Sequence, residues 1–434
     1  MQCSEKEPLR SRNAKEENGR YVPAYGETVA PPLTLPLPQP HNFAINRSRL
    51  ETIPLSESTS LRNSTAKPPA HLPIPAYDLQ HQQFRSAFEI LDQAIRARAF
   101  PCLSLAVNHH GKLVALNALG RFTFEPDADQ VTAPTLFDLA SLTKVVATTA
   151  MAMILYERGI LDLEIPVVAI VPEFATDDSR RREITIRMLL AHSSGLPAYE
   201  KLFLQARTRE KLLQAAFATP LTAGPGARAE YSDIGFIVLG VALERLAEES
   251  LDHFCQREIF GPLGMTKTVF NPAASLRNSI PPTADDHTFR KRIIQGEVQD
   301  ENASRLGGIA GHAGLFAAAG DVAIFAQVML NGGGPILRPE TVALFAHRES
   351  TPRGTSRALG WDTPSSPSQS GQYFSVRSFG HLGYTGTSLW VDPERELSIT
   401  LLTNRTWPDC SNQAIRQVRP AFHDAIIAGL EMNH

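Results

Sequence analysis

The chain has 434 residues, 43% of them hydrophobic and 20% charged, and is long enough for one large or two medium domains with an ample core. Its formal net charge of -3 gives no general attraction to nucleic acid or to anionic membranes. The four cysteines are widely spread and form no Cys-x-x-Cys motif, so they neither require an oxidising compartment nor indicate a zinc site.

The first part of the chain is rich in proline, serine, threonine and asparagine and shows no sustained periodicity. We expect residues 1–75 to be a disordered leader and residues 76–434 to form the folded domain. No segment is apolar over the length needed to span a bilayer, and the charged N-terminus lacks the apolar core of a signal peptide. As written, the sequence predicts a cytoplasmic protein, although a misassigned start site would hide an export signal.

Regular structure is expected from about residue 78. Apolar side chains recur at helical spacing over 84–95, which predicts an amphipathic helix to about residue 98. Residues 102–107 and 113–116 then read as a β-hairpin with a glycine-containing turn. His109 and His110 lie at its tip without a His-Glu-x-x-His motif, so we predict solvated turn residues and no metal site.

A serine and a lysine stand three residues apart at Ser141-Leu-Thr-Lys144, before an uncharged segment over 145–155. Such a segment is typical of a helix enclosed by protein on all sides. Ser141 would lie in the first turn, where the helix dipole favours developing negative charge, and Lys144 on the same face. A desolvated amine has a lowered pKa and can act as a base towards the serine hydroxyl. A serine that only caps the helix is the alternative.

The following region, about 160–300, is expected to be a mostly helical insertion, with short or clear helices at 184–190, 211–217 and 234–248. Ser193 and Ser194 precede Gly195 and are interpreted as part of a helix stop. The chain has no Gly-x-Ser-x-Gly motif, which excludes an α/β-hydrolase nucleophile elbow.

Two further polar segments follow. Tyr231-Ser-Asp233 stands before a helix, and we expect its start to project Tyr231 and Asp233 from a turn into a cleft, with helix capping by Asp233 as the alternative. Residues 308–316 are small enough to let backbones approach closely, and His312 within them is as much a structural as a functional candidate.

The C-terminal part predicts a strand leading to Asp392, paired in a hairpin with residues 397–403, and a helix over about 412–429. Glycines at 380, 383 and 386 are expected to keep the strand bare enough for a substrate to lie against it. Helices and hairpins at both ends of the chain imply one α/β fold, in which an antiparallel sheet is flanked by N- and C-terminal helices.

The order of Ser141-Leu-Thr-Lys144, Tyr231-Ser-Asp233 and His381-Leu-Gly383 resembles the serine β-lactamase and penicillin-binding-protein superfamily. The chain looks closest to the class C-like branch, which includes esterases and D-amino-acid peptidases, over about residues 80–430. The resemblance implies a β-lactamase/transpeptidase-like fold and acyl transfer through a covalent acyl-Ser141 on a small ester, amide or peptide, without a cofactor.

The resemblance also implies roles for individual residues. Lys144 and Tyr231 would share the proton transfer, and a cationic Lys144 would lower the pKa of Tyr231. The backbone N–H groups of Ser141 and Tyr384 would form the oxyanion hole. Substrate-binding positions would be Asp233, His381, Gly383, Tyr384 and Thr385.

Two departures from the family pattern bear on the substrate. β-Lactam-hydrolysing members usually carry Asn at the position of Asp233 and Lys-Thr-Gly at the position of His381-Leu-Gly383. Losing the lysine charge and the threonine hydroxyl removes two groups that hold a substrate carboxylate, for which Thr385, Thr387 and Arg305 are candidate replacements. The hypothesis is weak β-lactamase activity and better turnover of esters, or of amides that lack the carboxylate.

Two other functions stay open from the sequence. One is a true β-lactamase or D-alanyl-D-alanine carboxypeptidase acting on cell-wall peptides. The other is a binding protein that has kept the pocket and lost its chemistry. The oligomeric state is also open.

Overall fold

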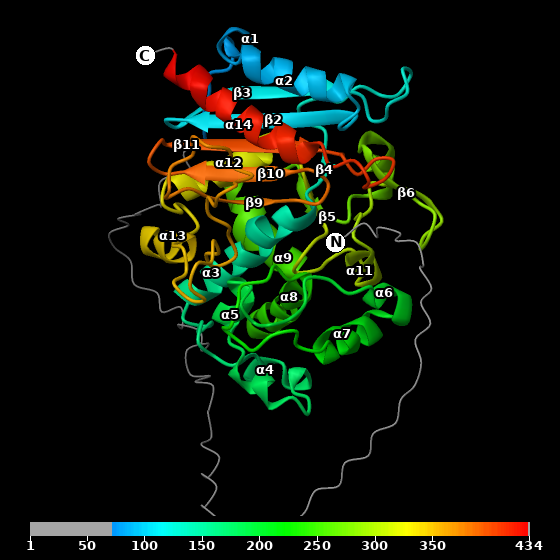
Figure 1. Ribbon diagram of the computed structural model, residues 1–434, viewed down its shortest axis with the longest axis vertical. Coiled ribbons are helices and arrows are strands. Elements are labelled where there is room, and N and C mark those ends of the chain that lie inside the picture. The colour runs from blue at the N-terminus through cyan, green and yellow to red at the C-terminus, as the bar shows by residue number, and fades with distance from the viewer. Residues whose placement is uncertain (1–71, 433–434) are drawn as a thin grey trace, which may run out of the picture. The chain divides into compact units, whose positions relative to one another are not determined.

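The computed structural model describes residues 72–432, which contain a six-stranded sheet in the order β1-β3-β2-β11-β10-β9 (Figure 1). All neighbouring strands are antiparallel except β1 and β3. The N-terminal and C-terminal parts of the described chain pair at the centre of the sheet, where Val107 of β2 lies opposite Ile399 of β11. The predicted antiparallel sheet is therefore confirmed. Its strands are β1 (Ile74–Pro75), β2 (Cys102–His109), β3 (Lys112–Gly120), β9 (Phe379–Leu382), β10 (Ser388–Asp392) and β11 (Leu397–Thr403).

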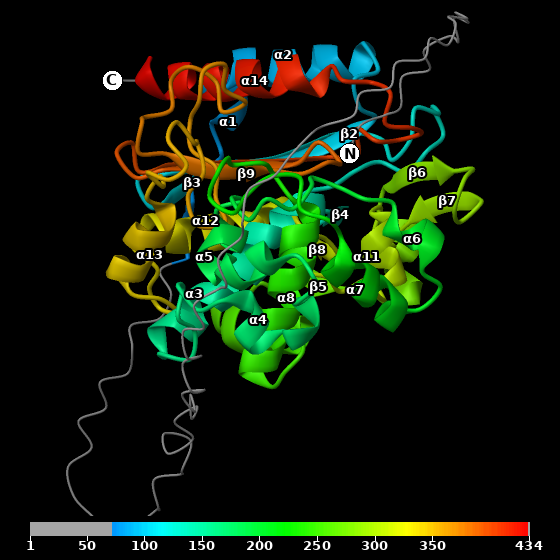
Figure 2. The same ribbon diagram turned by 60° about the horizontal axis from the view of Figure 1, so that its bottom comes forward.

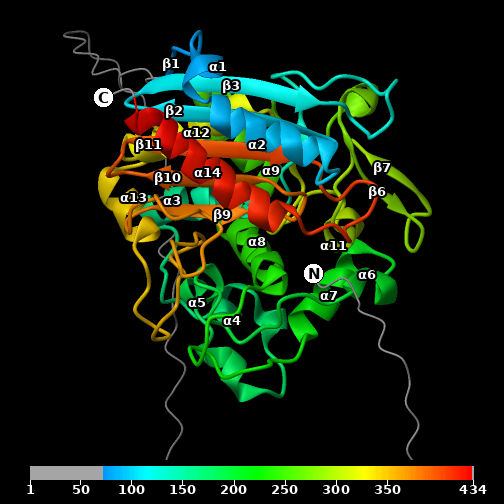
Figure 3. The same ribbon diagram turned by 45° about the horizontal axis from the view of Figure 1, so that its top comes forward.

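Helices from the two ends of the described chain cover one face of this sheet, as Figures 2 and 3 both show. They are α1 (Gln80–Gln83), α2 (Arg85–Arg96) and α14 (Ile415–Glu431). Phe88 and Leu91 of α2 bury their side chains in the same apolar cluster as Phe422 and Ile426 of α14. Both predicted terminal helices are confirmed, because each presents apolar residues at helical spacing to the sheet.

The opposite face packs on α12 (Ala319–Leu330) and on the segment that carries Ser141 and Lys144. This segment is a 3-10 turn (Ala140–Leu142), a π-helical turn (Lys144–Thr149) and then α3 (Ala150–Glu157). Every residue from Val145 to Leu155 is buried, as the lack of charge over this segment predicted, and Lys144 before it is buried as well. The expected continuous α-helix begins instead with a 3-10 turn and a π-helical turn. π-Helical turns are frequent at functional sites.

The remaining helices pack below this layer (Figure 1). They are α4 (Val167–Ile170), α5 (Ile186–Leu190), α6 (Leu202–Gln205), α7 (Arg209–Ala218), α8 (Asp233–Ala247), α9 (Leu251–Cys255), α10 (Gly261–Leu263), α11 (Glu301–Arg305) and α13 (Pro339–Ala346). The helices expected near 184–190, 211–217 and 234–248 correspond to α5, α7 and α8.

The structure also contains short strands that the sequence did not predict. A three-stranded sheet joins β4 (Phe137–Asp138), β8 (Leu315–Ala317) and β5 (Thr268–Phe270), and a hairpin within the predicted helical insertion joins β6 (Pro282–Asp286) to β7 (Arg292–Gln295). Strands of two to five residues are too short for alternation to reveal them, and those of the three-stranded sheet also pair with segments that are distant in sequence.

The leader expected over 1–75 lies outside the described residues, except for its last four. Of these, Ile74 donates its backbone N–H to the carbonyl of Gly111, 3.1 Å away. Within residues 72–432, none of the helices is long and apolar enough to cross a membrane.

Candidate active site

The chain enters the site through a strained turn. Asp138 ends β4, and Ala140 then adopts a φ of +47°, which is unusual for a residue with a side chain. The Asp138 carboxylate fixes this turn by accepting from the backbone N–H groups of Ala140, at 2.8 Å, and Gln299, at 2.6 Å. Burial raises the pKa of Asp138 to about 6, although both backbone donors oppose the rise. Ser141 therefore follows a backbone that is held from two sides.

Lys144 lies beneath Ser141, and its Nζ is 3.0 Å from Ser141 Oγ. Its side chain is completely buried and donates two more hydrogen bonds, to Asp233 Oδ1 at 2.7 Å and to the carbonyl of His312 at 2.9 Å. Burial lowers the pKa of Lys144, and the negative charge of Asp233 opposes this effect. The structure thus brings together the serine and the amine, one turn apart, and satisfies all three N–H bonds of an ammonium.

Tyr231 completes the contacts of the serine hydroxyl. Its hydroxyl is 2.6 Å from Ser141 Oγ and 3.0 Å from Asp233 Oδ1. Burial, followed by the charge of Asp233, raises the pKa of Tyr231 well above its usual value, although the hydrogen bond with Ser141 acts the other way. The lowering that the resemblance implied is not found, because burial and the charge of Asp233 both raise the pKa of Tyr231. Tyr231 is therefore a neutral phenol in this arrangement.

Asp233 lies against Lys144, near which the family resemblance places it. It is buried there, whereas the sequence led us to expect a side chain that projects from a turn or caps the helix. The cap of α8 is Ser232, whose Oγ accepts from the N–H of Gly235 at 3.0 Å and donates to the carbonyl of Pro197 at 2.7 Å. The neighbouring serine thus leaves the carboxylate free to serve Lys144 and Tyr231.

His192, which the sequence analysis did not single out, packs against Tyr231. The two ring centroids are 4.8 Å apart, and His192 Nδ1 accepts from the backbone N–H of Ser232 at 3.0 Å. Burial, with a smaller contribution from the Arg357 charge, lowers the pKa of His192 well below its usual value. A neutral imidazole therefore holds the tyrosine ring in place.

The loop after β9 is tied to the segment that precedes Ser141. Thr385 Oγ1 donates to the carbonyl of Asp138 at 2.8 Å, and Thr387 Oγ1 donates to that of Leu139 at 3.0 Å. Both threonines are fully buried, so their hydroxyls build the loop and do not replace the missing substrate-binding hydroxyl. These two bonds hold the turn that carries Tyr384 beside the entry to Ser141.

We expected the glycines at 380, 383 and 386 to leave a bare surface for a substrate. The structure shows instead that they are packed against other atoms of the protein. A Cβ on Gly383 would lie 1.9 Å from Thr387 Oγ1, and one on Gly380 would lie 2.4 Å from the ring of Trp390. A Cβ on Gly386 would meet Thr403 Oγ1 at 2.1 Å. The missing side chains therefore make room for the protein's own atoms, which is the other use of glycine in a strand.

His381 lies 6.0 Å from Tyr231 between ring centroids, and its Nδ1 is 2.8 Å from the carbonyl of Leu382. Burial, reinforced by the charges of Lys144 and Arg357, lowers the pKa of His381 to about 3. His381 is therefore neutral at ordinary pH and cannot supply the positive charge of the lysine that it stands in place of.

A positive charge reaches the site from a residue that the sequence did not reveal. The guanidinium carbon of Arg357 is 5.7 Å from the centre of the Tyr231 ring, and its side chain is 20% exposed. Arg305, the cation proposed from sequence, stacks on Phe289 at 4.8 Å. Arg357 lies in a loop with no motif, so no local signal could have found it.

Behind Lys144 lies the small-residue segment, whose predicted close backbone approach is confirmed. A Cβ on Gly311 would stand 2.2 Å from the carbonyl oxygen of Phe236 in α8. The carbonyl of Gly311 accepts from Thr148 Oγ1 at 2.7 Å, and the next carbonyl accepts from Lys144. The ring of His312 turns away and contacts Asp300 at 2.8 Å. His312 therefore serves the site through its backbone.

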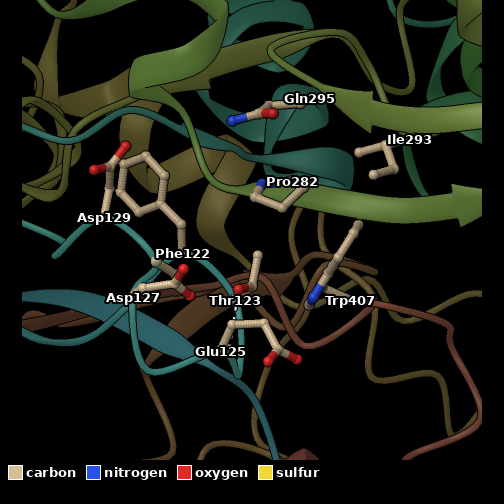
Figure 4. A pocket seen from close by; sticks show the side chains of 10 residues that line it. Phe122, Thr123, Glu125, Asp127, Asp129, Pro282, Ile293, Gln295 and Trp407 are labelled. Atoms are coloured by element: carbon tan, nitrogen blue, oxygen red, sulfur yellow. Dashed lines mark hydrogen bonds between the residues drawn. The ribbon is translucent and has the colours of Figure 1, made fainter.

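A separate hollow of about 350 Å³ shares no residue with the Ser141 cluster (Figure 4). Its three carboxylates, on Glu125, Asp127 and Asp129, are exposed. Within the described part of the chain, no group of three or more His, Cys, Asp or Glu side chains is arranged to hold a metal ion.

The chain is similar in sequence to proteins of known name and similar in fold to solved structures. The chain is 33% identical over 307 residues to a putative D-alanyl-D-alanine carboxypeptidase of Escherichia coli (strain K12), covering 64% of this chain and 70% of that protein. It is 32% identical over 361 residues to N-acetylmuramyl-L-alanine amidase of Bacillus subtilis (strain 168), covering 75% of this chain and 81% of that protein. The solved structure of EstCE1, a hydrolase with promiscuous acyltransferase activity, matches with a TM-score of 0.67 at 22% identity, over 80% of this chain and all of that one.

The structural match shows a shared fold. Residues 88–420 match the model of the Beta-lactamase family, which is most of the folded domain and includes the serine, tyrosine and histidine motifs. The chain therefore belongs to the Beta-lactamase family, within the superfamily of serine β-lactamases and penicillin-binding proteins.

Proposed function

We propose that this protein is a serine hydrolase that cleaves esters or amides through a covalent acyl-Ser141 intermediate. The observation that carries the proposal is the pair of contacts at Ser141 Oγ, from Lys144 Nζ at 3.0 Å and from the Tyr231 hydroxyl at 2.6 Å. A nucleophile within hydrogen-bond reach of groups that can move its proton is the arrangement that covalent acyl transfer requires.

The other roles follow from their positions. The N–H groups of Ser141 and Tyr384 would bind the oxyanion, because the Thr385 and Thr387 bonds hold the two segments together. His381 would face the acyl group as a neutral ring, and Lys144 would remain beside the reacting oxygen as a cation.

The test is labelling of the purified protein with a fluorophosphonate and, separately, with a penicillin, followed by intact-protein mass spectrometry and peptide mapping. We expect a fluorophosphonate adduct on Ser141 and none in the Ser141→Ala variant. An unlabelled serine in folded protein would favour a binding protein that has lost its chemistry. A penicilloyl adduct on Ser141, or loss of penicillin catalysed by the protein, would favour a true β-lactamase or penicillin-binding protein.

A second candidate function is a carboxypeptidase acting on cell-wall peptides, in line with the putative D-alanyl-D-alanine carboxypeptidase activity of the Escherichia coli relative. The specific observation in its favour is Arg357, whose charge lies over the Tyr231 ring and is partly exposed. A guanidinium in this place can hold the C-terminal carboxylate that a lysine of the third motif would otherwise bind.

The two candidates differ in what Arg357 does. Hydrolysis of a peptide ending in D-alanyl-D-alanine should exceed that of its C-terminal amide, and Arg357→Gln should remove this preference. Arg305→Gln is the matched control, because Arg305 stacks on Phe289 away from Tyr231. Equal turnover of acid and amide by the unaltered protein would leave the ester hydrolase as the better description.

A further inference from the structure

The hydrogen bonds at the site form a chain with one direction. The Tyr231 hydroxyl lies between Ser141 Oγ at 2.6 Å and Asp233 Oδ1 at 3.0 Å, and it has a single hydrogen to donate. Asp233 Oδ1 also accepts from Lys144 at 2.7 Å, as an ionised carboxylate does. Because a carboxylate only accepts, Tyr231 donates to Asp233, and the tyrosine oxygen therefore accepts the hydrogen of Ser141.

Lys144 has no capacity to take that proton. Its ammonium directs three N–H bonds to three acceptors, namely Ser141 Oγ, Asp233 Oδ1 and the carbonyl of His312. An ammonium with three partners has no lone pair. The neutral-amine alternative would leave Asp233 as a buried negative charge without a counter-ion, which is costly. Lys144 is thus an electrostatic partner here, and the serine proton must leave through Tyr231.

We infer that Asp233 is the terminal acceptor of the serine proton, which reaches it through the Tyr231 hydroxyl. This inference rests on the proposed function and specifies how that function works. As Ser141 Oγ bonds to the carbonyl carbon, its proton moves to the Tyr231 oxygen, and the Tyr231 proton moves to Asp233. The C=O π bond breaks, and the negative charge passes from Asp233 to the carbonyl oxygen, while Lys144 stays positive beside it.

The reverse transfer completes the step. When the tetrahedral intermediate collapses, Asp233 returns its proton to Tyr231, which protonates the leaving oxygen or nitrogen as its bond to carbon breaks. No charge is created or lost overall, because each proton that leaves Ser141 is matched by one gained at Asp233. An Asn at this position, as β-lactam-hydrolysing relatives usually carry, could accept the tyrosine hydrogen bond but could not take up the proton.

The experiment uses the full chain and measures the second-order rate of fluorophosphonate labelling at Ser141, which isolates attack by the serine. Asp233→Asn should slow labelling at least 100-fold, within the range of 10² to 10⁴ that a general base contributes. Tyr231→Phe should cause a comparable loss, and the double variant should be no slower than the slower single variant, because both residues act on one path. Tyr231→Phe keeps the Lys144 pair intact, so the inference remains testable if Asp233→Asn does not fold.

Rates in mixtures of H2O and D2O give a readout that a structural role would not change. Two protons in flight predict a curved dependence of the rate on deuterium fraction for the unaltered protein, and one proton predicts a straight line for Asp233→Asn. Labelling by Asp233→Asn within threefold of the unaltered protein, independent losses from the two substitutions, or a straight line for the unaltered protein would each overturn the inference. Absence of any label on Ser141 of the unaltered protein would instead overturn the proposed function.

Discussion

Replacing Asp233 with Asn should destabilise the fold, and the size of the effect should depend on pH. Lys144 is completely buried, 2.7 Å from Asp233, and would lose its counter-charge. Removing one member of a buried ion pair costs about 3–5 kcal/mol. The loss of stability has an upper limit, because the buried Lys144 can lose its proton instead of staying charged. An ordinary lysine has a pKa near 10.4, so removing its proton at pH 7 costs roughly 4.6 kcal/mol.

The sign of the pH dependence follows from the state of Lys144. Burial lowers its pKa and Asp233 opposes that effect, so the variant should have a still lower Lys144 pKa in the folded protein. A lysine whose pKa is lowered in the folded protein binds fewer protons in the folded than in the unfolded state. The free energy of unfolding therefore rises with pH, by about 1.4 kcal/mol per pH unit between the folded and the unfolded pKa. The cost of Asp233→Asn should fall from about 4.6 kcal/mol at pH 7 to about 1.9 kcal/mol at pH 9.

Urea unfolding at both pH values measures this cost. With a slope of about 3 kcal/mol per molar urea, the midpoint should fall by roughly 1.5 M at pH 7 and by roughly 0.6 M at pH 9. Adding Lys144→Met removes the orphaned charge and should restore much of the loss, because a neutral replacement of a buried pair is well tolerated. A pH-independent loss, or a double variant less stable than Asp233→Asn, would refute the reasoning.

Three other substitutions test buried contacts, two of them beside the site and one in α14 on the other face of the sheet. Gly311→Ala should destabilise the protein by about 1–3 kcal/mol, because its Cβ would lie 2.2 Å from a backbone carbonyl of α8. A Cβ on Gly320 would have no atom within 4 Å, so Gly320→Ala is the control and should not destabilise. Equal unfolding midpoints of the two variants would contradict this prediction. Burial lowers the pKa of His423 to about 3, so below pH 7 this histidine takes up a proton only on unfolding. Between pH 7 and pH 5 the unaltered protein should therefore lose about 2 kcal/mol more stability than His423→Gln. An equal loss in the two proteins, measured by urea unfolding, would argue against this prediction. Thr387→Val leaves the carbonyl of Leu139 without its 3.0 Å donor and should cost about 1–3 kcal/mol while slowing fluorophosphonate labelling, which an unchanged melting temperature and rate would disprove.

The long elements could be predicted because their signals are local. Apolar spacing over 84–95 specifies the face that α2 buries, and the absence of charge over 145–155 specifies a helix buried all round. The strands of β4, β5 and β8 could not be predicted in the same way, because each has two or three residues and pairs only with distant segments.

The candidate site likewise combines residues that local sequence predicts with residues that only the fold brings together. Ser141 and Lys144 are three residues apart, so helical geometry places them together whatever the rest of the chain does. The Arg357 guanidinium and the His312 carbonyl reach the site from loops, and only the fold brings them to Tyr231 and Lys144. Nothing in the sequence around Arg357 marks it, and the small residues around His312 indicate a close backbone approach without showing which carbonyl faces Lys144.

The sequence by itself determined the order of the motifs, the buried helix and the pairing of the two chain ends in one sheet, because these depend on spacing along a strand or a helix. Only the tertiary structure decided the charge state and the hydrogen-bond direction within the site. Those properties depend on which groups burial places within 3 Å of one another. Asp233 is the clearest case, since a residue that could cap its own helix instead faces Lys144 and Tyr231, and Ser232 takes the cap.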